Sequence, residues 1–226
     1  ASFVIAGQEE GGGNADLASN NGHDFLRGYF NLQEGPTDEM AATWLSGDKM
    51  EGLSYMTWDA DDPWVADTYY RSYYTIALCN EFLRHADDGS ISGFSADHQA
   101  KIRQYRAEAR FIRAYCYSML CDLFGGVPYI DETVGVKDIP VQMTRKATFE
   151  YAESELKAIL GESEGDDILK EPGQNEYARV DKVAAWFLLS RMYLNAQVWT
   201  GTDRYADCLT YAKKVIDSNA YPLASD

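Results

Sequence analysis

The sequence predicts an all-α fold of stacked helix pairs with one long irregular loop near the N-terminus. From residue 64 onward, apolar side chains recur at alternating intervals of three and four positions, which is the helical period. Breaks rich in Gly and Ser divide this stretch into helices, and helices joined by short connections pack antiparallel. Helix pairs that follow one another at a period of roughly 30 to 45 residues are typical of tetratricopeptide-like repeats.

We expect one domain over residues 1–226, which begins with a flexible tail at residues 1–23. A helix is predicted around residues 24–32. Residues 35–63 then mix Gly, Asp, Pro, Met and Trp without a sustained period. A loop this long on a helical body is uncommon unless it has a function. It is therefore the first place to look for a binding site.

The first helix pair is predicted over residues 64–124. Gly and Ser residues between 89 and 93 separate its two helices, Ser95 or Asp97 can cap the second one, and Gly125 ends it. The second helix carries a single apolar stripe formed by Ile102, Tyr105, Ala109, Ile112, Cys116, Met119 and Leu123. An extended connector is expected to follow it.

The second helix pair is predicted over residues 144–196, with Thr148 as the cap of its first helix. The second helix of this pair is strongly apolar, so Trp186 and Phe187 are expected in the core. Residues 203–219 are predicted to begin a third pair.

The charge of the chain excludes several classes of partner. The 36 acidic and 20 basic residues give a formal net charge of −16, and the pI is near 4.5. A uniformly acidic surface repels the phosphate backbone of nucleic acid and the headgroups of anionic lipid. The apolar runs fall far short of the ~20 residues that a membrane-spanning helix needs.

The sequence offers no pattern for a metal, a cofactor or a catalytic centre. The four cysteines form no CxxC pair and are expected to be buried, although their even number leaves disulfides open. Asp59, Asp61 and Asp62 could suggest calcium, but Trp64 and Tyr70 occupy the positions where an EF-hand needs Gly and Glu. A solvated acidic turn before Pro63 is therefore the preferred interpretation, and an irregular calcium site stays open as the alternative. A nucleophile elbow and an HExxH motif are also missing from the sequence.

Arg106, Arg110 and Arg113 are spaced so that they share one face of the predicted helix. Like charges at this spacing repel one another unless anions compensate them. In so acidic a chain, we expect them to form structural ion pairs with carboxylates on a neighbouring helix.

Several segments occur in an order that resembles one known family. The strongest are EARFIRAY at residues 108–115 and LFGGVPY at residues 123–129. Weaker matches lie at residues 36–39, 70–82, 144–145, 184–194 and 215–223. Together they resemble the SusD/RagB family, which comprises outer-membrane glycan-binding lipoproteins of the starch-utilisation type, and the resemblance runs from Leu26 to near the end of the chain.

The resemblance implies a non-enzymatic protein at the outer surface of the outer membrane. Such a protein binds oligosaccharides or polysaccharides for nutrient uptake and passes them to a SusC-like TonB-dependent transporter. Family members are longer, so the chain is expected to be an N-terminal portion. The lipid-bearing Cys of the family is also missing, so Ala1 is expected to be a trimmed start, and membrane contact would require a lipid anchor absent from this chain.

Sugar recognition requires aromatic faces for the apolar side of a pyranose and polar groups for its hydroxyls. The early loop contains both types of residue. The candidate glycan-binding residues are Trp44, Asp48, Tyr55, Trp58, Asp59, Asp61 and Trp64. The alternative is that the tryptophans belong to the core. This is favoured for Trp64 because it opens a helix, whereas both interpretations stay open for Trp44 and Trp58.

Two other functions remain as alternatives. A helical-repeat scaffold would bind a protein or peptide segment in a groove between helices, and exposed aromatic residues would then line that groove. A glycoside hydrolase would need a pair of carboxyl groups across the scissile bond, and the acidic residues fall in no recognisable catalytic motif. We therefore expect a binding protein and no enzyme.

Overall fold

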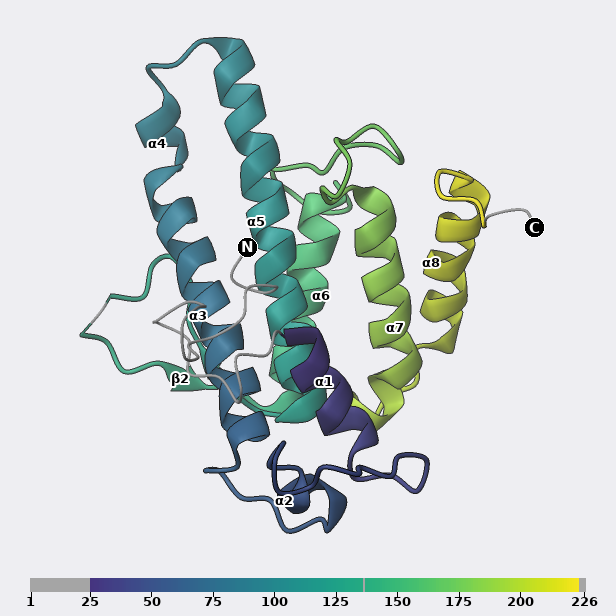
Figure 1. Cartoon of the computed structure of the whole chain (residues 1–226). Coiled ribbons are helices and arrows are strands. Elements are labelled where there is room, and N and C mark those ends of the chain that lie inside the picture. The colour runs from purple at the N-terminus through teal and green to yellow at the C-terminus, as the bar shows by residue number, and fades with distance from the viewer. Residues whose placement is uncertain (1–24, 136, 224–226) are drawn as a thin grey trace. The chain divides into compact units, whose positions relative to one another are not determined.

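The computed structural model describes residues 25–135 and 137–223 and confirms the all-α fold (Figure 1). The expected flexible tail at residues 1–23 lies outside the described residues. The helices in the described part are α1 (Phe25–Glu34), α2 (Glu51–Ser54), α3 (Pro63–His85), α4 (Asp88–Ile91), α5 (Ala96–Leu123), α6 (Arg145–Ile159), α7 (Lys182–Thr200) and α8 (Tyr205–Ser218). The expected connector contains strands β1 (Pro128–Tyr129) and β2 (Val141–Gln142), which pair antiparallel with Pro128 opposite Gln142.

The chain divides into two compact units whose boundary falls inside α3. The first unit comprises residues 1–75 and the second comprises residues 76–226. In the described residues, the first unit contains α1, α2 and the first half of α3. The remaining elements belong to the second unit. The expectation that residues 1–226 form one domain stays a prediction.

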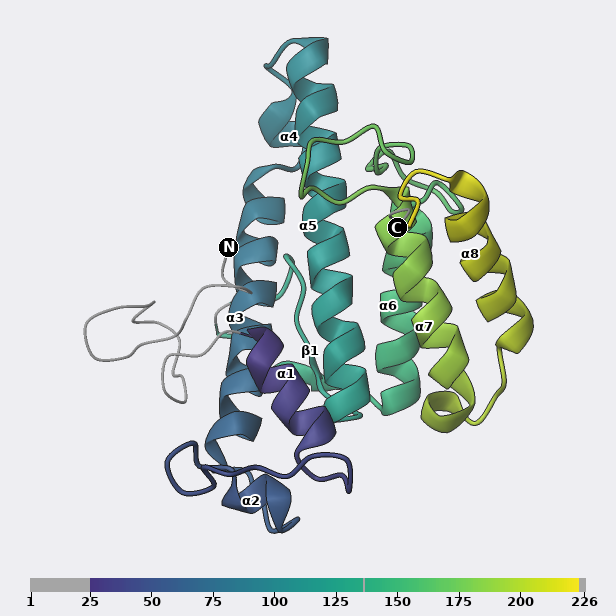
Figure 2. The same ribbon diagram turned by 45° about the vertical axis from the view of Figure 1, so that its right-hand side comes forward.

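The second unit has the predicted stacked helix pairs. Figures 1 and 2 show α5, α6, α7 and α8 side by side in chain order, and neighbouring helices in this series are in contact. The large side chains Tyr117, Phe149, Leu156 and Leu189 are buried between them. Each of α6 and α7 thus packs on the helix before it and the helix after it, and the assignment of the helices to particular pairs stays a prediction.

The apolar stripe predicted for α5 is correct only in part. Cys116 and Met119 are buried, but Ile112 is more than one-third exposed. Residues 116–121 are buried without interruption, which a single stripe cannot explain. This part of α5 is covered from more than one side, because it packs on α6 and the Tyr117 hydroxyl accepts from the Ile130 amide at 2.8 Å.

The helix ends follow the predicted signals with one exception. Ser95 caps α5 by accepting from the His98 amide, and α5 ends before Gly125, whose φ is +80°. Thr148, however, does not cap α6. The cap is Thr144, whose hydroxyl accepts from the Ala147 amide at 3.1 Å, and Thr148 lies one turn inside the helix. Two threonines four positions apart offer the same signal, and the actual helix starts at the earlier one.

The Gly-Gly pair that follows α5 has a structural reason. The positive φ of Gly125 is rarely adopted by other residues. Gly126 lies so close to the Met143 carbonyl that a Cβ atom on it would overlap the oxygen. The two glycines therefore allow the connector to turn sharply back toward the start of α6.

The cysteines are all free thiols. Cys79, Cys116 and Cys121 are buried as expected, whereas Cys208 is partly exposed. Phe187 also differs from the prediction, because its side chain is 54% exposed rather than in the core. In the part of the chain that the structure describes, no helix combines the length and apolarity needed to cross a membrane.

Candidate functional site

The loop between α1 and α3 folds over a small core of its own in the first unit. Met50, Leu53 and Trp64 form the buried centre of this core. Partly buried Leu32, from α1, and Leu45, from the loop, pack against it. The irregular segment is therefore held in a defined conformation, so that its polar and aromatic side chains have fixed positions.

A cavity of about 370 Å³ lies between α1 and the first part of this loop. We name it the Trp44 pocket. Its lining residues are Arg27, Asn31, Met40, Ala41, Ala42, Thr43, Trp44, Asp48 and Met50. Its size suits a small ligand or one or two units of a larger one.

The Trp44 pocket combines an exposed ring with a charged pair. The Trp44 side chain is 76% exposed. Arg27 donates from Nη2 to Asp48 Oδ2 at 2.8 Å, and both side chains are partly open to solvent. The amide of Asn31 adds a group that both donates and accepts. An aromatic face, a guanidinium, a carboxylate and an amide therefore meet in one hollow.

Trp64 supports this pocket from below. Its side chain is only 1% exposed, which corrects its inclusion among the candidate glycan-binding residues and confirms its interpretation as core. The indole Nε1 donates to the Asp48 carbonyl at 3.0 Å, and the Arg27 guanidinium lies 5.6 Å from the ring centre. Trp64 thus contacts both members of the ion pair and fixes their positions.

The other candidates do not line the Trp44 pocket. Tyr55 and Trp58 are exposed elsewhere on the loop, the latter by 46%. Asp59 accepts from the Asp61 amide at 3.0 Å, which is a local turn contact.

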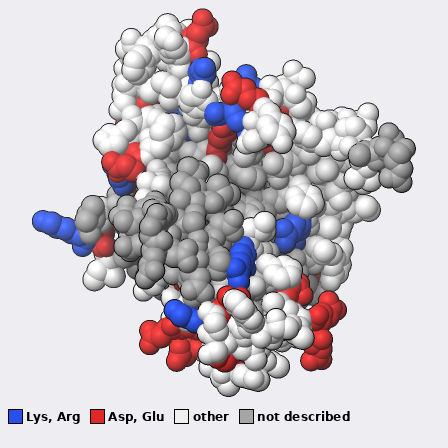
Figure 3. Space-filling model, viewed as in Figure 1, with Lys and Arg blue, Asp and Glu red and all other residues white. Residues whose placement is uncertain are grey.

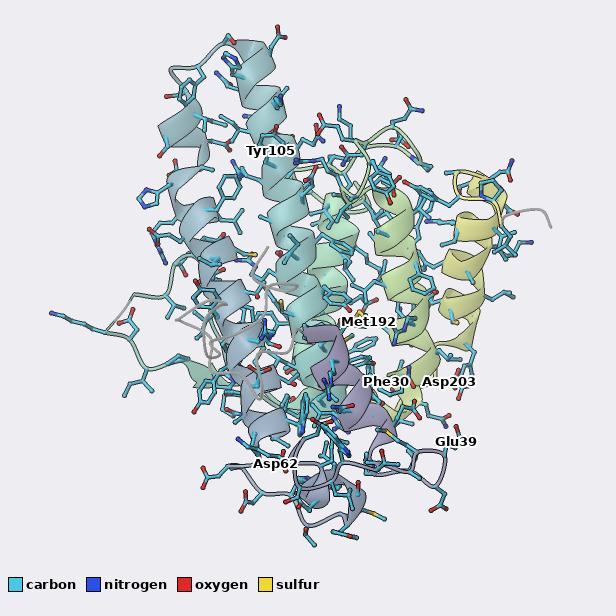
Figure 4. All side chains as sticks on the ribbon, in the orientation of Figure 1. Phe30, Glu39, Asp62, Tyr105, Met192 and Asp203 are labelled. Atoms are coloured by element: carbon cyan, nitrogen blue, oxygen red, sulfur yellow. The ribbon has the colours of Figure 1, made fainter. Side chains whose placement is uncertain are left out.

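Asp62, which Figure 4 shows at the base of α3, is buried and accepts from the Trp64 amide at 3.0 Å. It caps the helix and is not the solvated turn residue that the sequence suggested. Among the described residues, no group of three or more His, Cys, Asp or Glu is placed to hold a metal ion.

Of the nine residues that line the Trp44 pocket, the sequence analysis identified only Trp44 and Asp48 as candidates, and the missed residues include two with polar side chains on α1. Arg27 and Asn31 lie four positions apart on α1, so they share one face of the helix. This spacing was visible in the predicted helix at residues 24–32. The sequence did not show that this helix face contacts the loop at Asp48, which lies 21 positions after Arg27.

Several acidic side chains of the first unit are exposed. Asp38, Glu39, Asp59 and Asp61 are exposed, and Figure 3 shows acidic side chains over the loop around α2. One carboxyl group of the first unit with a clearly perturbed pKa lies outside the pocket: burial raises the pKa of Asp67 to about 6, although Arg71, 3.6 Å away, opposes this shift. Asp67 is thus a buried residue of α3 and no part of the site.

Exposed aromatic residues on the early loop would favour glycan binding, whereas exposed aromatic residues beside the helices would favour a peptide-binding scaffold. The structure has both. Trp44, Tyr55 and Trp58 lie on the early loop. A second group, which includes Phe187, lies at one end of α7. The position of the aromatic residues alone therefore does not decide between the two functions.

Comparisons with known proteins point in one direction. Residues 30–194 match the model of a SusD-like family described as "Starch-binding associating with outer membrane". The chain is also 34% identical, over 228 aligned positions, to the starch-binding protein SusD of Bacteroides thetaiotaomicron. The match covers all of this chain but 38% of SusD, so the chain spans well under half the length of this relative.

Solved structures share the fold. A SusD-like protein from Bacteroides fragilis has a TM-score of 0.67 at 22% identity, with 86% of this chain and 35% of the other covered. Surface glycan-binding protein A from Bacteroides uniformis also has a TM-score of 0.67, at 23% identity, with 86% and 42% covered. The helical architecture is therefore that of SusD-like proteins.

Proposed function

Because the chain belongs to the SusD-like family, we propose that it is a glycan-binding protein and that the Trp44 pocket contacts the sugar. The observation that carries this proposal is the exposed Trp44 ring beside the Arg27–Asp48 pair. A pyranose has an apolar face that stacks on an indole, and its hydroxyls can donate to Asp48 and accept from Arg27. The name of the relative SusD, a starch-binding protein, supports the same ligand class.

Binding without turnover is part of the proposal. Hydrolysis of a glycosidic bond uses two carboxyl groups on opposite sides of that bond. Of the described residues that line the Trp44 pocket, only Asp48 carries a carboxyl group, and it is held by Arg27. The described lining residues therefore offer hydrogen bonds and a stacking surface, but they hold no pair of carboxyl groups for general acid and base catalysis.

We further propose that the protein acts at the outer-membrane surface and delivers its glycan to a SusC-like TonB-dependent transporter. The family description, which places its members in association with the outer membrane, supports the location. The proposed partner rests on the family resemblance of the sequence. Affinity purification of the tagged protein from the outer membranes of its native host should recover a TonB-dependent transporter, and repeated recovery without one would contradict the partnership.

Replacement of Trp44 by Ala should weaken glycan binding by roughly 30-fold, because a central ring that stacks on the ligand contributes about 2 kcal/mol. Trp44 is largely exposed, so its removal should leave the fold intact. Isothermal titration with maltoheptaose, laminarihexaose and mannohexaose would measure the dissociation constants, and circular dichroism would check the fold.

Trp58→Ala is the matched control. It removes the same type of side chain from the same loop, but from outside the Trp44 pocket. We expect less than a threefold change in affinity for this variant. Equal losses in both variants would mean that the whole loop, rather than the pocket, binds the ligand. Unchanged affinity in Trp44→Ala would remove the pocket from the proposal.

A further inference from the structure

A second cavity, of about 650 Å³, lies in the second unit at the N-terminal end of α7. The loop that joins α6 to α7 and the segment that follows α8 meet there, at the same end of α7 in Figures 1 and 2. Three aromatic side chains line it, one each from the loop, α7 and the final segment: Tyr177, Phe187 and Tyr221. We name it the Tyr177 pocket.

The rings of the Tyr177 pocket are open to solvent. Tyr177 is fully exposed, Phe187 is 54% exposed and Tyr221 is 64% exposed. Small residues such as Ala184 and Ala220 form part of the wall between them and leave space for a ligand. Aromatic side chains that line a hollow of this size are typical of small-molecule and saccharide sites.

Tyr221 is held in place by a buried carboxylate. Its hydroxyl donates to Asp181 Oδ2 at 2.7 Å. Asp181 is itself fixed, because it also accepts from the amides of Gly173 and Val183, at 2.8 and 2.9 Å, and caps α7. The hydrogen bond to Asp181 also raises the pKa of Tyr221. The hydroxyl end of the exposed ring is therefore anchored, and an anchored side chain loses less conformational entropy when a ligand stacks on it.

Tyr177 stands on a strained but well-anchored turn. Ala178 has a φ of +64°, in the left-handed region that costs a non-glycine residue about 1 kcal/mol or more. Asn175 anchors the turn by donating from Nδ2 to the Val180 carbonyl at 2.6 Å and to Glu108 Oε1 at 3.1 Å. The turn directs Tyr177 into solvent, so burial of its ring does not compensate for the strain. Strain of this kind is concentrated at ligand-binding sites.

The charges of the Tyr177 pocket favour an uncharged ligand. Of the described residues that line it, Arg179 is the cation, and it is already paired with Glu108 and stacked on Tyr105 at 4.7 Å. The exposed carboxylate of Glu176 and the carboxylate of Asp181 would repel an anionic ligand. A carboxylate accepts hydrogen bonds from hydroxyl groups, which a neutral sugar provides in abundance.

We propose that the Tyr177 pocket is a second saccharide site, which binds a neutral pyranose by stacking it on Tyr177, Phe187 and Tyr221. It acts independently of the Trp44 pocket. This inference rests on the proposed glycan-binding function of the chain.

The test is a titration of wild-type protein, Tyr177→Ala, Trp44→Ala and the double variant with maltoheptaose, laminarihexaose and mannohexaose. For a hexaose or heptaose that binds, wild-type protein should show two sites, and Tyr177→Ala should keep only the Trp44 site. Trp44→Ala should keep the Tyr177 site unchanged while the other site binds about 30-fold more weakly, and the double variant should show only that weakened site. Nitration of Tyr177 by tetranitromethane, located by peptide mass spectrometry, should fall at least about fivefold when the sugar is saturating. Tyr205, which is half exposed on α8 and outside the pocket, is the control residue for nitration.

The outcomes separate this inference from the proposed function. In one outcome, Trp44→Ala abolishes binding, Tyr177→Ala binds like wild type, and the sugar does not protect Tyr177 of wild-type protein from nitration. The second site is then overturned and the proposed function stands. If binding survives Trp44→Ala but is lost in Tyr177→Ala, the second site is supported and the Trp44 pocket is not the contact. Absence of binding to every sugar in wild-type protein overturns both.

Discussion

Replacement of Arg113 by Ala should lower the free energy of unfolding by about 3–5 kcal/mol. The Arg113 side chain is almost fully buried in α5. It pairs with Glu155 of α6 at 2.9 Å and with Glu132 of the connector, and it donates to Asn80 of α3 at 2.7 Å. Its removal leaves buried acceptors without their donor, which costs far more than the loss of an exposed pair. Urea denaturation followed by circular dichroism would measure the change.

The effect of Arg113→Ala should depend on pH. Burial alone would raise the pKa of Glu155, but hydrogen bonds and charge from Arg110 and Arg113 outweigh it and hold this pKa below its usual value. A carboxyl group with a lowered pKa in the folded state stabilises the protein above its unfolded pKa, and this contribution is lost as pH falls through the folded pKa. In Arg113→Ala the pKa of Glu155 is lowered less than in wild type. The difference between the free energies of unfolding of the two proteins should therefore shrink below about pH 4.5.

Arg103→Ala is the control for Arg113→Ala. Arg103 lies on the same helix and pairs with Asp88 at 3.3 Å, but Asp88 is exposed and Arg103 is only partly buried. An exposed pair of this kind contributes about 1 kcal/mol or less. If the two variants lost the same stability, burial of the Arg113 network would not be the cause of its contribution.

The ion pairs of α5 were predictable because three arginines on one helix face repel one another unless carboxylates compensate their charges. The sequence predicted that Arg106, Arg110 and Arg113 face carboxylates, and the structure confirms this. Glu155 on α6 binds both Arg110 and Arg113. Arg106 instead pairs with residues outside the long helices, namely Asp88 in α4 and Asp167 in the loop before α7. Charge balance thus predicts that partners exist, whereas their location depends on tertiary packing.

The helices could be predicted well because their signals are local. A period of 3.6 residues, an oxygen-bearing cap such as Ser95 and a glycine such as Gly125 act within one or two turns of the chain. The exposure of Phe187 could not be predicted in this way. The apolar helix α7 has no polar face that would mark which side chains are left uncovered, so its exposed side is decided by its neighbours.

In the irregular segment that forms the Trp44 pocket, the sequence likewise could not predict which side chains are buried. Trp44 and Trp64 lie in or beside the same loop, yet one is exposed and the other is buried. Composition identified the loop as a candidate site, but a loop has no period that assigns its side chains to an inside or an outside. Only Trp64 carried a local indication of burial, because it lies at the start of a helix and is expected to pack against the loop before that helix.

Replacement of Trp64 by Ala should destabilise the first unit by about 3–5 kcal/mol, because it removes the largest side chain from a small core. It should also impair the Trp44 pocket, since the indole contacts both Asp48 and Arg27. Hydrogen exchange measured by mass spectrometry should show lost amide protection in residues 45–55. Titration with a bound heptaose should show a loss of affinity at least as large as that of Trp44→Ala.

Trp64→Phe separates these two effects. Phenylalanine retains most of the apolar contact with Met50 and Leu53 but cannot donate to the Asp48 carbonyl. We expect the loop to keep most of its protection, while affinity falls about five- to tenfold because the Asp48 backbone loses a hydrogen bond worth about 1 kcal/mol. Wild-type affinity in Trp64→Phe would show that packing alone positions the Arg27–Asp48 pair. Trp58→Ala, which removes an exposed indole from the same segment, should change neither protection nor affinity appreciably.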